Sequence, residues 1–115
     1  MIALPHETEA LVEFPQLQRL IDLRNAGWTF LPTTVNGEIT EIHGLRVWPE
    51  GWADALRVRY VTDARAVRCD HTGAITWQHD GGLTEVIDGL MSLPAPDDRL
   101  APRLVIAPAA RLWRS

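Results

Sequence analysis

The sequence contains no lysine and only one cysteine. All eleven basic residues are arginine, and the fifteen acidic residues outnumber them, giving a formal net charge of -4. This charge argues against a protein that mainly binds phosphate backbones. The arginine bias is explained most economically by the codon usage of a GC-rich bacterial genome; the alternative is a choice of arginine for forked recognition of phosphate or carboxylate. Cys69 has no second cysteine for an intramolecular disulfide, so we expect it to act as a small apolar side chain.

Long apolar runs are also missing. No segment approaches the roughly 20 apolar residues that a membrane-spanning helix needs. The N-terminus carries Glu7, Glu9 and Glu13 and lacks the basic start and apolar stretch of a signal peptide. We therefore expect a cytoplasmic protein without membrane contact.

The sequence lacks the common motifs of catalysis and metal binding. It has no Gly-x-Ser-x-Gly nucleophile motif and no phosphate-binding glycine loop. Cys69, Asp70, His71 and His79 supply metal-ligating atoms, but neighbouring strand residues point to opposite faces, and a structural zinc needs four converging ligands. We predict no metal, no cofactor and no catalytic residue, which favours a non-enzyme.

The length and composition favour one domain spanning residues 1–115. With 46% hydrophobic and 23% charged residues the chain can form one ordinary core. Residues 1–13 form an arm or a short helix, residues 94–102 a proline-rich connection, and residues 109–115 a tail.

Apolar spacing predicts one helix that starts near Pro15 and ends at Gly27, and a second at residues 83–93. Between them we expect five strands, with a last strand at residues 103–107. The prediction is an α+β fold: a mostly antiparallel five- or six-stranded meander with two helices on one face, in the order α-β-β-β-β-β-α-β. The last strand pairs with the first strand, the fifth strand or another copy of the chain.

Turn chemistry predicts the strand registers. The Asn36-Gly37 turn pairs Phe30 with His43. A two-residue turn at Thr62-Asp63 places Val58 opposite Val67, and a three-residue loop ending in Gly73 then places Val67 opposite Trp77. In this register Val58, Val67 and Trp77 share the core face.

The opposite face would carry Arg57 directly across from Arg68, with Arg59 beside them. Like charges opposite one another are destabilising, so something must compensate. The candidates are Asp70 or Asp80, water around solvated arginine heads, and an anionic ligand or acidic partner surface. Three tryptophans without predicted core positions, which are Trp48, Trp52 and Trp113, are further candidates for partner contact.

A second candidate site lies at one end of the meander, where Tyr60, Arg65 and His79 are expected to converge on the face that also holds His43. These side chains could bind a small anion, or they could form an ordinary polar rim.

The first functional hypothesis is a small non-enzymatic protein-binding module, of an adaptor, regulatory or immunity type, whose partner is another protein or a second copy of itself. The alternative is a ligand-binding protein or minor enzyme at the Tyr60/Arg65/His79 end. The third is weak nucleic-acid binding through Arg57, Arg59 and Arg68.

Overall fold

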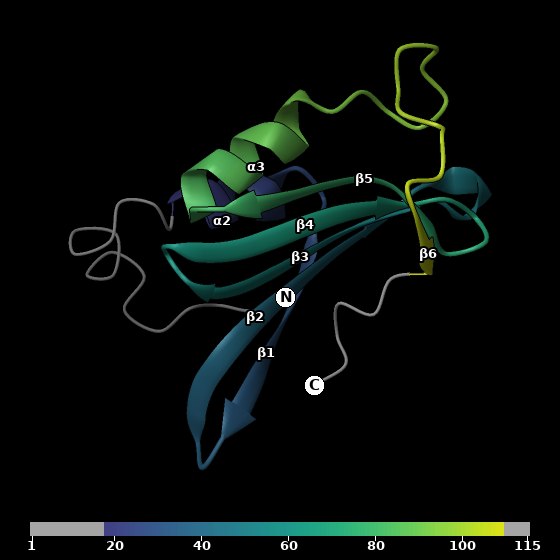
Figure 1. Cartoon of the computed structure of the whole chain (residues 1–115). Helices are drawn as coiled ribbons and strands as arrows, with labels where there is room; N and C mark the ends of the chain where they lie inside the picture. The colour runs from purple at the N-terminus through teal and green to yellow at the C-terminus, as the bar shows by residue number, and fades with distance from the viewer. Residues whose placement is uncertain (1–17, 110–115) are drawn as a thin grey trace.

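Residues 18–109 are described by a computed structural model, in which six antiparallel strands form one sheet and two helices cover one of its faces (Figure 1). The strands are neighbours in chain order, β1-β2-β3-β4-β5-β6, so the predicted α+β meander is confirmed. The elements are α2 (Gln18–Asn25), β1 (Thr29–Val35), β2 (Glu38–Val47), the short 3-10 turn η2 (Pro49–Gly51), β3 (Ala53–Tyr60), β4 (Asp63–Cys69), β5 (Ala74–Gly81), α3 (Leu83–Ser92) and β6 (Ala107–Ala109). The predicted arm and most of the predicted tail, with Trp113, lie outside the described residues.

The main core lies between the sheet and the helices. The apolar positions of α3 are spaced three and four residues apart, which puts them on one stripe facing the sheet. Two leucines of α2 complete the layer. Residues buried in this core are Leu20, Leu23, Trp28, Leu56, Val58, Ala64, Ala66, Leu83, Val86, Ile87 and Leu90. Neither described helix has the length and apolar character that crossing a membrane requires.

The first hairpin has the predicted turn but only part of the predicted register. Asn36 and Gly37 have φ values of 53° and 82°, as a two-residue turn of this type requires. A bulge between Thr33 and Thr34 then shifts the pairing by one, so that Phe30 faces Gly44. The predicted pairing of Phe30 with His43 is therefore wrong, because an extra residue enters β2 before His43 is reached.

The hairpin of β3 and β4 departs further from its predicted register. Tyr60 faces Asp63, and a bulge follows, so that Val58 faces Ala64 rather than Val67. The predicted partner of Val58 is thus wrong by three residues. Because three is odd, the two faces of β4 are exchanged.

The exchange moves Val67 away from the helices and Arg68 towards them. Arg57 consequently faces Arg65, and the predicted pairing of Arg57 with Arg68 is wrong. Val67 forms a small second cluster on the other face, with Ala55 and Ile75.

The last hairpin restores part of the prediction. Gly73 has a φ of 88°, as expected for its loop, and Cys69 faces Ile75. A bulge between Arg68 and Cys69 places Trp77 opposite Arg68 instead of Val67, so the predicted Val67–Trp77 pairing is wrong. Trp77 still packs against the helix-covered core.

The final strand is shorter and later than predicted. β6 pairs with β5, which is one of the three predicted partners. The predicted span of residues 103–107 is wrong: Leu104, Val105 and Ile106 are exposed and precede the strand. The Ile106 N–H donates to the Ile75 carbonyl over 2.8 Å and so joins the end of that stretch to the sheet.

Candidate functional site: the distal face of the sheet

The face of the sheet that points away from α2 and α3, here called the distal face, is arranged in cross-strand rows. One row, here called the charged row, holds His43, Arg57, Arg65 and Asp80, with Leu31 at its β1 end. The next row along the strands is apolar at its centre, with Leu45, Ala55 and Val67. A third row is wholly apolar, with Val47, Ala53, Cys69, Ile75 and Ala107. The charged row and the neighbouring apolar row are therefore about 7 Å apart along the strands.

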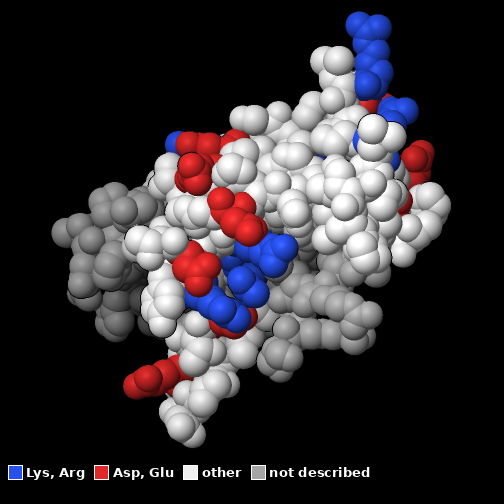
Figure 2. Space-filling model, viewed as in Figure 1, with Lys and Arg blue, Asp and Glu red and all other residues white. Residues whose placement is uncertain are grey.

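Most charges around the charged row are paired. The Nε2 of His43 lies 2.8 Å from Oε2 of Glu41. The Nε of Arg59 lies 3.1 Å from Oε1 of the same glutamate. The Nε of Arg65 lies 3.1 Å from Oδ1 of Asp80, although it is not aligned for a hydrogen bond. Figure 2 shows this mixture of signs, with basic side chains bordered by acidic ones in the middle of the view.

Arg57 is the exception in this row. Its Nε is buried and donates to no acceptor, and no described carboxylate lies within ion-pair distance of its guanidinium. Its direct neighbours across the strands are the basic residues His43 and Arg65, and the guanidinium of Arg65 offers it no acceptor. The positive charge of Arg57 therefore favours an anion on this face.

The basic neighbours of Glu41 lower the pKa of its carboxyl group. The hydrogen bond with His43, and after it the hydrogen bond and charge of Arg59, hold the pKa of Glu41 below its ordinary value. The carboxylate is therefore ionised and committed to these two partners, and it leaves Arg57 without compensation.

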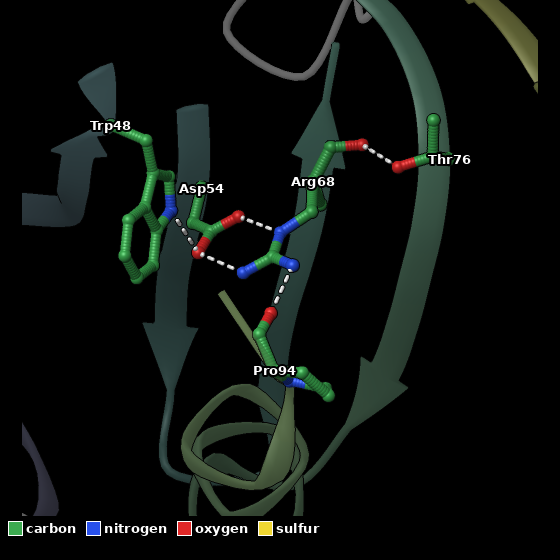
Figure 3. A network of polar contacts seen from close by, with 5 residues as sticks. All are labelled: Trp48, Asp54, Arg68, Thr76 and Pro94. Atoms are coloured by element: carbon green, nitrogen blue, oxygen red, sulfur yellow. Dashed lines mark hydrogen bonds and ion pairs between the residues drawn. The ribbon is translucent and has the colours of Figure 1, made fainter. Parts of the chain in front are cut away.

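Arg68, predicted to face a partner, is instead buried on the helix side with 0% exposure (Figure 3). Its Nε and Nη2 donate to the two carboxylate oxygens of Asp54 over 2.6 and 3.0 Å, and its Nη1 donates to the carbonyl of Pro94 after α3. The indole N–H of Trp48 donates to the same carboxylate over 2.9 Å. Arg68 is unavailable to a partner because its donors hold the end of α3 against the sheet.

The loop tryptophans have different positions. The guanidinium carbon of Arg46 lies 4.0 Å from the centroid of the Trp48 ring. The same ring lines a hollow of about 300 Å³ beside Pro96. Trp52 is half-buried at the end of η2. Neither side chain lies in the charged row of the distal face.

The predicted convergence of Tyr60, Arg65 and His79 is wrong. Arg65 lies on the distal face, whereas His79 stacks on Trp77 on the helix side, with ring centroids 6.3 Å apart. Tyr60 is 70% exposed and lines a groove beside Leu83 of α3. His43, the fourth candidate, does lie in the same row as Arg65, with Arg57 between them.

No known protein family, curated protein or solved structure matches the chain. Its function must be inferred from the geometry of its surfaces. Among residues 18–109 no three metal-ligating side chains gather as a metal site would require.

The sequence pointed to Arg57 but not to its true neighbours. Alternation along β3 correctly put Arg57 and Arg59 on one face, because alternation does not depend on the partner strand. The bulge between β3 and β4 brings Arg65 opposite Arg57, and the bulge in the first hairpin puts His43 on the face opposite Phe30. The turn residues indicate neither bulge.

Proposed function

We propose that this protein is a non-enzymatic protein-binding module that uses the distal face of its sheet. The observation that carries the proposal is Arg57, a cation in the middle of that face whose buried Nε has no acceptor. Leaving such a group unsatisfied costs free energy. A partner with an acidic group would pair with the charge of this guanidinium, which no described carboxylate neutralises.

The apolar rows support the same function. Leu45 is 44% exposed and Val47 is 67% exposed, although both project from the sheet beside buried neighbours. This surface combines arginine, a residue type enriched at interface hot spots, with exposed apolar area that a partner can bury.

The thiol chemistry favours a binding role over catalysis. Burial, with a smaller contribution from the charges of Asp70 and Asp54, raises the pKa of the Cys69 thiol. A thiol with a raised pKa is a poor nucleophile at neutral pH.

The other two hypotheses lose support. The ligand site requires Tyr60, Arg65 and His79 on one face, and they are divided between two. Nucleic-acid binding requires several free arginines, but Arg68 is buried and Arg59 is paired with Glu41.

Site-specific photo-crosslinking tests the proposal. A photoreactive amino acid replaces Val47 on the distal face, and in a control variant it replaces Met91, which is exposed on α3. After irradiation in the native cells, we expect a discrete protein adduct from position 47 and none from position 91. An adduct of twice the mass of the chain identifies a second copy as the partner.

Two outcomes contradict the proposal. Either no adduct forms from position 47, or position 91 gives the same adducts with equal yield. The second result would mean that the adducts reflect general collision rather than a defined face.

A further inference from the structure

We infer that the partner presents an extended segment in which a carboxylate side chain is followed, two and four residues later, by apolar side chains. This inference rests on the proposed function and specifies the chemistry of its partner. The carboxylate occupies the space over Arg57, and the apolar side chains lie over Leu45 and Val47.

The spacing of the rows leads to this segment. Arg57, Leu45 and Val47 belong to three successive rows of the distal face, each two residues from the last along the strands. An extended chain repeats its side chains on one side every two residues, which is the same distance of about 7 Å. A segment that runs along the strands therefore matches all three rows at once.

The charges favour a single carboxylate over a chain of phosphates. Glu41 and Asp80 lie on the same face as Arg57, outside ion-pair distance of it, and they already neutralise Arg59 and Arg65. One added anion satisfies Arg57, whereas a second or third would meet these carboxylates and be repelled. The planar guanidinium also matches the fork of a carboxylate.

The test is a nuclear magnetic resonance titration of the full chain that follows the Nε–Hε signals of its arginines. The probe is the blocked peptide Ac-Glu-Ser-Leu-Ser-Val-NH2. We expect the Arg57 signal to shift most, and affinity to fall about tenfold or more when glutamine replaces the glutamate of the peptide, because a charge-assisted hydrogen bond is lost.

Two matched variants and one matched peptide are the controls. Arg57→Gln should lose the same affinity and remain folded, since it removes a charge opposite Arg65. Arg19→Gln makes the same charge change on α2, where Arg19 pairs with Asp88, and should bind like the unaltered chain. The peptide Ac-Glu-Leu-Ser-Val-Ser-NH2 has the same composition but points its apolar side chains away from the glutamate side, and should bind more weakly.

Each alternative occupant gives a different result, and each overturns the inference. Equal affinity for the glutamate and glutamine peptides excludes carboxylate recognition. Equal shifts with inorganic phosphate mean that any anion suffices, and tighter binding of a short oligonucleotide indicates nucleic acid. An Arg57 shift that depends on protein concentration alone indicates a second copy.

The two experiments can fail separately. A protein adduct from position 47 that persists in Arg57→Gln, together with no discrimination between the peptides, overturns only the inference. Absence of the adduct from position 47 when Arg57 is unaltered overturns the proposed function.

Discussion

Arg68 and Arg57 lie on adjacent strands and show how burial decides the role of an arginine. The guanidinium of Arg68 is removed from solvent, and Asp54 and the Pro94 carbonyl accept its donors. Arg57 is half-buried, and its Nε has no acceptor. The first arrangement holds α3 against the sheet, and the second is the basis of the proposed binding surface.

The pair of Asp54 and Arg68 gives the first prediction. Asp54→Ala leaves a buried guanidinium without its carboxylate, and we expect the free energy of unfolding to fall by about 3–5 kcal/mol. Urea denaturation measures the loss. Asp80→Ala, which breaks an exposed pair with Arg65, should cost no more than about 1 kcal/mol.

The double variant Asp54→Leu with Arg68→Met is the check on this explanation. It removes both charges and should be more stable than Asp54→Ala, although the indole N–H of Trp48 loses its acceptor. A double variant that is less stable than Asp54→Ala would show that packing, and not the uncompensated charge, causes the loss.

Glu41 gives a pH-dependent prediction. Because His43 and Arg59 lower its folded pKa below the ordinary value of 4.5, the carboxylate stabilises the fold above that pH. The contribution is lost as the pH falls from 4.5 through the lowered value. The difference in free energy of unfolding between the unaltered chain and Glu41→Gln should be about 0.3–1 kcal/mol near neutral pH and should vanish in acid.

Urea denaturation of both chains at a series of pH values gives this difference. Glu38→Gln, at the exposed tip of the β1–β2 hairpin, is the matched control and should show a smaller pH dependence. A difference that grows as the pH falls would contradict the assigned pKa direction.

At the scale of elements, the strands were predictable and their bulges were not. Asn36-Gly37 and Gly73 determine their turns because these positions need a positive φ. The β1–β2, β3–β4 and β4–β5 pairings each contain a register shift that no turn residue indicates. A shift by an odd number exchanges the faces of a strand, which is why alternation was right within β3 and wrong between β3 and β4.

The bulge in the first hairpin has a consequence that can be measured. It places Gly44 beneath the rings of Phe30 and Trp28, where an added Cβ would lie 2.6 Å from Cε1 of Phe30. Gly44→Ala must displace a ring, and we expect a loss of about 1–3 kcal/mol. Thermal unfolding should show a Tm lower by at least about 4 °C.

A smaller ring partner provides the control for Gly44. In a Phe30→Leu background the same Gly44→Ala change should cost less, because the atom it meets has been removed. Equal costs in the two backgrounds would place the strain elsewhere in β2.

For the whole molecule, the sequence was sufficient to predict the layers of the fold but not the residues that meet at the candidate site. Two amphipathic helices flanking five strands require a helix-covered antiparallel sheet, since each apolar face must be buried. The residues that meet on the distal face depend on three registers at once, and one bulge changes which charges are neighbours. The apolar residues Leu104, Val105 and Ile106 likewise indicated a strand that tertiary pairing confines to Ala107–Ala109.

Native-state hydrogen exchange tests how stability is distributed over this architecture. Leu56 and Ala66 lie in the centre of the sheet and are fully buried, so their amides should exchange only by global unfolding. The hairpin tip at residues 33–40, which is exposed throughout, and the short β6 should exchange fastest.

The same measurement with a partner bound separates two ways of binding a sheet. A partner on the distal face contacts side chains and adds no backbone hydrogen bonds, so it should raise the protection of the globally exchanging amides by one common factor, set by ligand concentration and Kd. A partner that extends the sheet would instead protect the outward amides of an edge strand selectively. Selective protection along β1, or along β5 beyond its short pairing with β6, would therefore contradict binding by the distal face.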